Sequence, residues 1–327
     1  MTYERKHFNP EASGDSSKDV EGNIAFHRAG TAAEDLYVFA PKVVLALNVA
    51  LATGRPLLVS GEPGCGKSTL ARSAAAVLDW PFYGRTVTSR TQAADLLWTF
   101  DAVRRLNDAY TPNTRLPSNQ HYVEPGPLWW AFAPKTAAQR GCDPIEARVH
   151  ARDPRVGGTN VSEAAVVLID EIDKADPDVP NDLLEPFDRR SFTVHETQQQ
   201  IEAQRRVLMV LTTNRERTLP RAFLRRCVTL DLDAPTAAWL ESIAVKRYGA
   251  QGKAIFSDIA KELMALRNEA HKAGVREPST AEYLDAVNAV IDLKVNRPSE
   301  DWRRIKQALL WKSDAPLPER TAEQSQP

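Results

Sequence analysis

The sequence predicts an α/β fold in which helices surround a parallel sheet, followed by a helical C-terminal region. Two continuous apolar runs, residues 166–169 and 207–211, are typical of strands buried on both faces of a parallel sheet. A third run, residues 57–59, leads into a glycine-rich turn and then into a helical pattern. From Pro235 onward the apolar residues recur at helical spacing. A chain of 327 residues has room for two such parts.

Composition excludes several classes of protein. The 42 Lys and Arg residues nearly balance the 43 Asp and Glu residues, so no overall positive field attracts nucleic acid or an anionic membrane. The apolar stretch at residues 43–52 is far shorter than the ~20 residues that span a bilayer. The three cysteines show no metal-ligand spacing. We expect a soluble, cytoplasmic protein with no membrane association.

The N-terminal part changes character near residue 40. Residues 1–30 are polar without an apolar period, which predicts a disordered tail that adds little to the core. Pro41 is well placed to begin a helix and Gly54 to end it. That helix leads directly into the first strand, at residues 57–59.

The glycine-rich turn has the sequence GEPGCGKS and matches a P-loop. Glycines let backbone N–H groups converge on phosphates, and a helix N-terminus adds a favourable dipole. Lys67 would reach the β- and γ-phosphates of ATP, and Ser68 would hold Mg²⁺. The predicted nucleotide contacts are Gly61, Glu62, Pro63, Gly64, Cys65, Gly66, Lys67, Ser68, Thr69 and, from a later strand, Asp170. Cys65 is either a tolerated small residue or a thiol activated for redox chemistry.

The stretch after the P-loop helix predicts a second strand at residues 80–88 and one helix over residues 91–110. Residues 111–120 are polar, and residues 143–160 look irregular. Between them lies an aromatic cluster, Trp129, Trp130 and Phe132. It either packs against the sheet or forms a loop that contacts a partner.

Two carboxylates follow the apolar run at residues 166–169, where parallel sheets bind ligands. This is the Walker B arrangement. Asp170 would hold the Mg²⁺ shell partly through water, and Glu171 would polarise the attacking water.

Several shorter elements complete the sheet. We expect a short helix at residues 180–187 and a hairpin that pairs residues 191–194 with residues 204–207 around a polar tip. The strand at residues 207–211 leads to Asn214, near the expected γ-phosphate. A short helix at residues 219–227 contains Arg225 and Arg226 and precedes a fifth strand, residues 227–232. Four amphipathic helices follow, centred on Leu240, Leu263, Val287 and Ile305, and residues 316–327 form a second tail.

With these motifs the chain resembles AAA+ ATPases, and within them the MoxR-like group of the helix-2-insert clade. The resemblance is carried by GEPGCGKS at residues 61–68, by residues 166–194 and 211–227, and by GPLWWAF at residues 126–132. It covers the chain from about residue 40 to the end of the helical region. It implies a five-stranded parallel sheet with helices on both faces, a helical lid, and ATP sites shared between subunits of a ring, usually a hexamer.

The resemblance also implies roles for individual residues. Asn214 matches the sensor 1 position, which orients water together with Glu171. Arg225 and Arg226 match the arginine finger region, and we favour Arg226. The expected sensor 2 position holds Ala281, so Arg276 is the candidate substitute.

The resemblance gives the domain boundaries as well. We expect an AAA+ domain at residues 31–234 with an insert at about residues 91–160, a lid at residues 235–315, and tails at residues 1–30 and 316–327.

Three functions remain open. The leading hypothesis is a chaperone-like ATPase that remodels a partner protein, which family resemblance gives as one with a von Willebrand A domain. We expect the partner protein to contact Trp129, Trp130 and the tip of the predicted hairpin at residues 197–200. The second is a nucleic-acid-associated motor that uses the pairs Arg104–Arg105, Arg189–Arg190 and Arg205–Arg206, which the charge balance does not favour. The third is a slow, ATP-controlled assembly switch.

Overall fold

The structure is a computed structural model that describes residues 6–12, 16–19, 22–27, 36–111, 116–142, 150–159 and 163–312. The chain divides into two compact units. The first comprises Met1–Gly30, Tyr37–Gly61 and Lys67–Asp231, and the second comprises Thr31–Leu36, Glu62–Gly66 and Leu232–Pro327.

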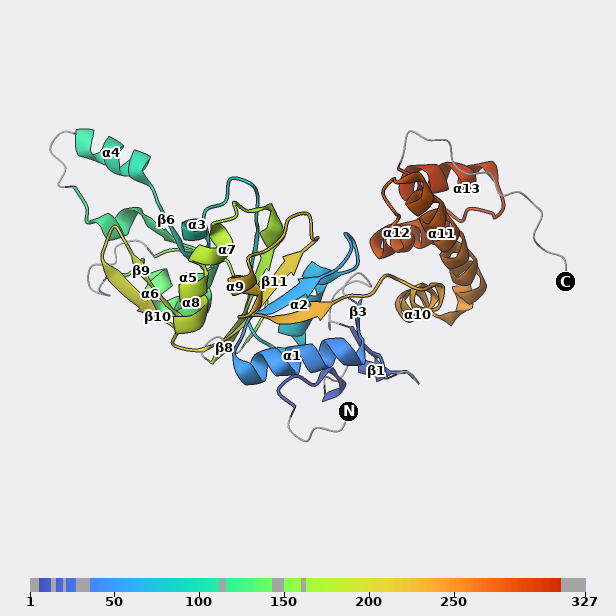
Figure 1. Ribbon diagram of the computed structural model, residues 1–327, viewed down its shortest axis with the longest axis horizontal. Helices are drawn as coiled ribbons and strands as arrows, with labels where there is room; N and C mark the ends of the chain where they lie inside the picture. Colours follow the sequence, from blue (N-terminus) through green and yellow to red (C-terminus); the bar gives the residue numbers. More distant parts are fainter. Residues whose placement is uncertain are drawn as a thin grey trace. The chain divides into compact units, whose positions relative to one another are not determined.

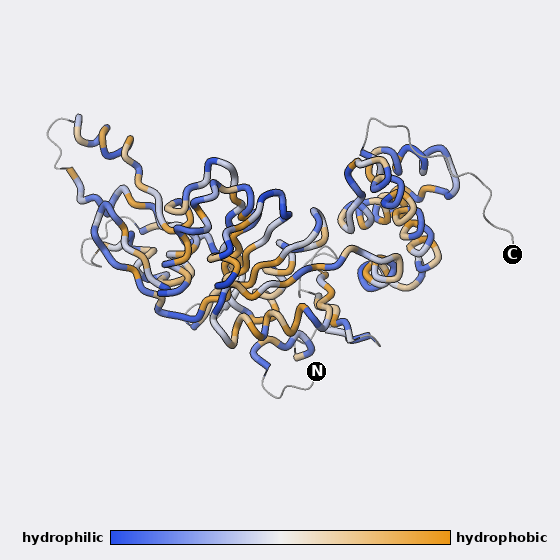
Figure 2. The backbone as a smooth tube through the Cα atoms, viewed as in Figure 1, coloured by the Kyte–Doolittle hydropathy of each residue, from blue (hydrophilic) through white to orange (hydrophobic). Residues whose placement is uncertain are grey.

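A five-stranded parallel sheet forms the centre of the first unit, in the order β12-β4-β11-β8-β5. Its strands are β4 (Leu57–Ser60), β5 (Phe82–Thr86), β8 (Ala164–Asp170), β11 (Arg206–Thr213) and β12 (Val228–Asp231). The first six residues of β8 are all buried, as expected for a central parallel strand. In Figure 2 the hydrophobic colour concentrates along these strands. The predicted α/β P-loop fold is confirmed.

Helices beside the sheet begin and end as their sequence indicates. Helix α1 (Pro41–Thr53) starts at a proline and ends at Gly54, whose φ of 70° is left-handed. Helix α2 (Lys67–Leu78) buries a small-residue face that contacts β8 and β11. Shorter helices are α7 (Val179–Asp182), α8 (Leu184–Arg189) and α9 (Arg221–Leu224). Figure 1 shows α1 and α2 beside the sheet.

The described residues of the N-terminal segment, 6–12, 16–19 and 22–27, do not form the disordered tail that the sequence predicts. A 3₁₀ turn (Pro10–Ala12) is followed by β1 (Ser16–Lys18), β2 (Ile24–His27) and β3 (Leu36–Phe39), which form a three-stranded sheet. Phe8 is fully buried, and its ring lies 5.2 Å from that of Phe39. The Asn48 side chain of α1 donates to the Phe8 carbonyl at 2.9 Å. The described residues of this segment therefore add to the core, although their few apolar residues form no period.

The predicted helix over residues 91–110 is also wrong. It is divided into α3 (Ala93–Leu97), β6 (Trp98–Phe100) and α4 (Ala102–Tyr110), because β6 pairs antiparallel with β7 (Val123–Pro125). The Asp101 side chain accepts from the Arg104 amide and so begins the new helix α4. A 3₁₀ turn (Asn119–Tyr122) precedes β7. Figure 1 shows α4 beyond β6, away from the central sheet of the first unit.

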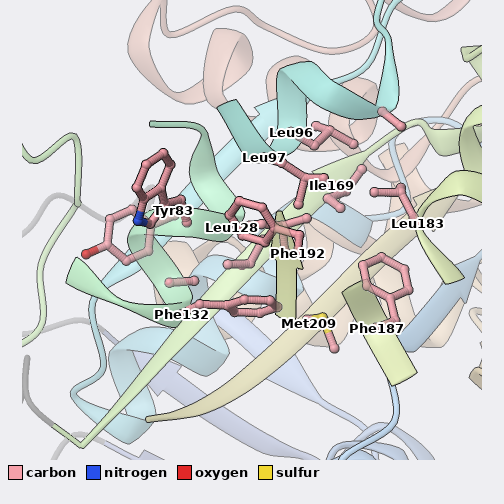
Figure 3. Close-up of a cluster of buried hydrophobic side chains, with 14 of the residues drawn as sticks. Tyr83, Leu96, Leu97, Leu128, Phe132, Ile169, Leu183, Phe187, Phe192 and Met209 are labelled. Carbon is pink, nitrogen blue, oxygen red and sulfur yellow. The ribbon is translucent and has the colours of Figure 1, made fainter. Parts of the chain in front are cut away.

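The aromatic cluster belongs to the core of the first unit. Trp129, Trp130 and Phe132 lie in α5 (Pro127–Phe132) and are at most 2% exposed. The Trp129 indole donates to the Thr136 hydroxyl of α6 (Pro134–Ala138) at 2.9 Å. Figure 3 shows Phe132 and Phe192 in this buried cluster. The alternative of a partner-contacting aromatic loop is wrong, because these rings are enclosed within their own chain.

The predicted hairpin exists with a different second strand. Strand β9 (Ser191–Val194) pairs with β10 (Gln199–Glu202) rather than with residues 204–207. Arg206 and Val207 instead begin β11 of the central sheet. The turn is therefore shorter than expected, and the predicted contact residues 199–200 lie in a strand.

The four predicted C-terminal helices are confirmed. They are α10 (Ala237–Tyr248), α11 (Lys253–Ala273), α12 (Thr280–Asp292) and α13 (Glu300–Ile305), with a 3₁₀ turn (Ala250–Gly252) before α11 and a π-helical turn (Lys306–Leu310) after α13. Ser279 and Glu282 form a capping box at the start of α12. The predicted tail at residues 316–327 lies outside the described residues. Among those described, none of the helices has the length and apolar content that crossing a membrane requires.

Candidate active site

The loop between β4 and α2 has the geometry that phosphate binding needs. Gly64 and Gly66 adopt positive φ angles of 76° and 93°, which only glycine adopts at little cost. Lys67 is 6% exposed, and its ammonium group donates to the Gly61 carbonyl at 2.8 Å. The side chain therefore turns back along the loop at the N-terminus of α2, where the backbone N–H groups favour an anion.

Ser68 and Asp170 meet although they are 102 residues apart. The Ser68 hydroxyl lies 2.8 Å and 2.9 Å from the two carboxylate oxygens of Asp170. The Thr212 hydroxyl donates to the same carboxylate at 2.6 Å. Only oxygen atoms gather here, and oxygen ligands suit Mg²⁺. The described residues contain no cluster of three or more His, Cys, Asp or Glu side chains that could hold a metal ion. In proteins Mg²⁺ usually keeps several waters and binds one or two carboxylates together with substrate phosphates.

Glu171 and Asn214 are also brought together. Glu171 has a left-handed backbone, with φ of 60° and ψ of 49°, and its amide donates to the Thr212 hydroxyl at 2.8 Å. The Asn214 side-chain amide donates to Glu171 Oε1 at 3.2 Å. Non-glycine residues rarely adopt this conformation, and such strain often accompanies functional sites. The turn aims the Glu171 carboxylate toward the end of β11.

Asp173 and Lys174 are two site residues that the sequence reasoning missed. Asp173 is 2% exposed, and its Oδ2 accepts from the backbone amides of Asn214 at 3.1 Å and Glu216 at 2.9 Å. Lys174 donates to Glu171 Oε2 at 2.7 Å. The available signal was their position, since polar residues directly after a buried strand lie at the ligand-binding edge of the sheet.

Arg225 and Arg226 lie near the amino-terminal ends of the parallel strands. The residues described above lie at the carboxyl-terminal ends. Arg225 and Arg226 precede β12, whose first residue Val228 pairs with Leu57, the first residue of β4. The phosphate-binding loop follows the last residue of β4, about 10 Å further along the strand at ~3.3 Å per residue. Arg226 donates to Asp188 at 2.5 Å, whereas Arg225 is exposed and forms no ion pair within the described part of the chain. Within one chain, the register therefore places Arg225 and Arg226 away from the strand ends that carry Asp170 and Glu171.

In the second unit, Arg276 is engaged by a carboxylate. Its guanidinium lies 3.0 Å from Glu282 of α12. The same unit contains Arg267 of α11, which is 5% exposed and pairs with Glu62 at 2.8 Å and with Glu277 at 2.7 Å. The sequence analysis did not single out Arg267, because an arginine within an amphipathic helix such as α11 is usually an ordinary surface residue.

The three arginine pairs considered for nucleic acid are largely used within the chain. Arg205 is buried and donates to the Ala131 carbonyl at 2.7 Å. Arg190 donates to the Gly54 carbonyl at 3.0 Å, and Arg189 pairs with Glu185 at 2.9 Å. Arg105 donates to the Asn119 side chain at 2.9 Å. The burial of Arg205 and the ion pair of Arg189 reduce the positive charge available to a phosphate backbone, whereas Arg105 and Arg190 bond to neutral oxygens and keep their charge.

Residues 56–227, more than half of the chain, match the sequence model described as AAA domain (dynein-related subfamily). No curated protein matches the sequence. Among solved structures, a point mutant of RuvB from Thermotoga maritima is similar with a TM-score of 0.46 and 18% identity, covering 82% of this chain and 68% of that chain. The Thermotoga maritima RuvB Holliday junction branch migration motor gives a TM-score of 0.43 and 19% identity, covering 82% and 67%.

Proposed function

The chain belongs to the AAA domain family, dynein-related subfamily, and on that premise we propose an ATP-driven motor whose active sites lie between the subunits of a ring. Members of this family are ATPases that bind nucleotide, typically with Mg²⁺, and commonly assemble into rings. The proposal assigns each site residue a role in one of two neighbouring subunits.

The phosphate loop and the oxygen cluster would hold the substrate. In this proposal the loop amides and Lys67 bind the ATP phosphates, and Ser68 and Asp170 hold Mg²⁺ directly or through water. The bound ion would neutralise charge that builds up on the phosphates. The contact of Ser68 with both Asp170 oxygens supports this assignment.

Glu171 and Asn214 would act on the attacking water. A carboxylate within hydrogen-bond reach of water can accept its proton, and an amide can fix its direction. The 3.2 Å contact between the two side chains supports a shared task. We therefore assign Glu171 as the polarising base and Asn214 as the orienting residue.

The position of Arg225 and Arg226 is the observation that carries the ring proposal. They lie near the amino-terminal ends of the strands, whereas the phosphate loop of their own chain follows the carboxyl-terminal end of β4. A contact with the γ-phosphate therefore requires a second subunit. Arg225 is exposed and without an ion pair among the described residues, which favours it for this contact. Arg226, the residue preferred from the sequence, would first exchange Asp188 for the phosphate.

We further propose that the protein belongs to the MoxR-like group and that it acts on a client protein. The proposed client carries a von Willebrand A domain. The two-stranded insert between β5 and β8 supports the group assignment. Helix α4 supports a client surface: none of its nine residues is buried, and Val103, Leu106 and Tyr110 are 71%, 56% and 78% exposed on an amphipathic helix.

The substitution Glu171→Gln tests the proposed chemistry. It keeps the shape of the side chain and removes the proton acceptor, so ATP should bind with unchanged affinity while turnover falls at least about 100-fold. Bound ATP should then persist and stabilise the assembly, which size-exclusion chromatography with ATP would detect. The matched control is Glu202→Gln, an exposed glutamate on β10 that should leave turnover unchanged.

The outcomes separate the alternatives. Normal turnover in Glu171→Gln would remove the assigned role of Glu171. Salt-sensitive DNA binding that stimulates hydrolysis would favour a nucleic-acid motor over a protein remodeller.

A further inference from the structure

Both oxygens of the Glu171 carboxylate are engaged within the chain. Oε1 accepts from the Asn214 side chain at 3.2 Å, and Oε2 accepts from the Lys174 ammonium group at 2.7 Å. The shorter contact is also an ion pair. Lys174 is therefore the closest cation to the group assigned as the base, and neither its charge nor its position is used by the proposed mechanism.

The turn that carries Lys174 is fixed by its neighbours. A 3₁₀ turn (Ile172–Lys174) follows Glu171, and the Lys174 amide donates to the Glu171 carbonyl at 3.0 Å. Ile172 is fully buried and Asp173 is 2% exposed, so both anchor the turn. The turn places the Lys174 side chain beside the Glu171 carboxylate.

The ion pair favours the charged form of Lys174. The hydrogen bond to Glu171 raises the pKa of Lys174, so the lysine stays protonated at neutral pH. An ammonium group that donates to a carboxylate oxygen competes with water for that oxygen, and Lys174 occupies Oε2 of Glu171 in this way. The pair thus opposes the task assigned to Glu171.

We propose that Lys174 is a positioning residue that holds Glu171 in a resting ion pair, and that Glu171 must release Lys174 before it engages the attacking water. The inference rests on the proposed role of Glu171 as the polarising base. Lys174 thereby keeps hydrolysis slow until the bound nucleotide and the neighbouring subunit offer Glu171 or Lys174 a better partner. It acts through Glu171 and touches no reacting atom.

The test is Lys174→Met, which keeps most of the side-chain length and removes the charge. At saturating ATP and at a concentration where the protein assembles, kcat should rise about two- to fivefold, the scale of an ion pair between partly exposed groups. ATP affinity, measured by equilibrium binding, should not change. Lys174→Arg keeps the charge and should restore a rate close to that of the unsubstituted protein.

Lys272→Met is the matched control. Lys272 pairs with Glu269 at 2.9 Å, also three residues earlier in the chain, but it lies on α11 and outside the proposed site. Its loss should leave kcat unchanged. A rise in kcat for both variants would assign the effect to general loosening and overturn the inference.

A second comparison links the effect to Glu171. In a Glu171→Gln background, adding Lys174→Met should produce no rise, because no base remains to be released. Stimulation in that background would overturn the inference. So would an unchanged or lower kcat for folded Lys174→Met, and Lys174→Gln serves if the Met variant does not fold.

The two proposals can fail separately. A lower rate in Lys174→Met together with an inactive Glu171→Gln would remove only the role of Lys174. Normal turnover in Glu171→Gln would remove the proposed role of Glu171 and with it the inference about Lys174, whereas a lack of ATP turnover in the unsubstituted protein would remove the proposed function itself.

Discussion

The hydroxyl oxygen of Ser68 lies 2.8 Å from one carboxylate oxygen of Asp170 and 2.9 Å from the other. Ser68 belongs to the first turn of α2, and Asp170 is the last residue of β8. The parallel sheet makes this contact, because β4 and β8 flank β11 and both end at the same edge. Two residues assigned to Mg²⁺ from separate motifs therefore share one location.

Replacing Ser68 by alanine should impair hydrolysis through the metal. The variant loses an oxygen ligand, so the Mg²⁺ concentration for half-maximal turnover should rise about 10-fold or more. Ser73→Ala, on the same helix, is the control and should not change it. Titration of turnover with Mg²⁺ measures both, and an unchanged Mg²⁺ requirement in Ser68→Ala would contradict the assignment.

Replacing Asp173 by alanine should weaken both the fold and the reaction. The backbone amides of Asn214 and Glu216 would lose a buried charged acceptor, at a cost of about 2–3 kcal/mol in the free energy of unfolding. Turnover should fall because Asn214 is no longer held. Urea unfolding and steady-state kinetics measure the two effects.

The control for Asp173 is Asp176→Ala, because Asp176 accepts one backbone N–H in an exposed turn. It should change stability by less than about 0.5 kcal/mol. Equal effects of the two substitutions would argue against a special role for Asp173.

The cysteines should differ in reactivity at pH 8. Burial raises the pKa of the Cys227 thiol to about 12, so only ~10⁻⁴ of it is thiolate at that pH. Cys65 lies in the phosphate loop and is partly exposed. A maleimide should therefore modify Cys65 first, ATP should slow that modification, and Cys65→Ala should resist inactivation. Peptide mapping by mass spectrometry checks this, and modification of Cys227 as fast as Cys65 in folded protein would contradict it.

The aromatic segment and helix α4 should respond differently to truncation. Trp129→Ala removes a fully buried ring and should cost about 3–5 kcal/mol of stability. Leu106→Ala, on α4, should cost less than about 0.5 kcal/mol because that side chain is 56% exposed. Urea denaturation measures both effects. A Trp129→Ala variant as stable as the unsubstituted protein would contradict the burial of this ring in the core.

The central sheet was predictable because its strands carry their signal locally. The runs at residues 166–169 and 207–211 are apolar throughout, and the glycines of the loop fix its backbone. The insert was not predictable, because Trp98–Phe100 is a strand only through pairing with Val123–Pro125. Its own residues also fit a helical period. The buried N-terminal Phe8 likewise depends on a partner, Asn48 of α1, that its own segment does not reveal.

Some residues of the candidate site could likewise be predicted from local sequence, and others could not. Asp170, Glu171 and Asn214 follow buried strands, so their proximity could be expected from the sequence. The contacts of Asp173 and Lys174 could not, because they depend on the left-handed backbone of Glu171 and the turn that follows it. The edge of the sheet that carries Arg225 and Arg226 is fixed by the β12–β4 register.

Mixing two inactive variants tests most directly the proposal that the active site is shared between subunits. Glu171→Gln lacks the base, and an Arg225→Ala/Arg226→Ala double variant lacks both finger candidates, so each alone should be nearly inactive. In a mixed ring, arginines from the first would meet an intact Glu171 in the second. The account predicts that the mixture hydrolyses ATP well above the sum of its components; a mixture that co-assembles but gives no more than that sum would contradict it.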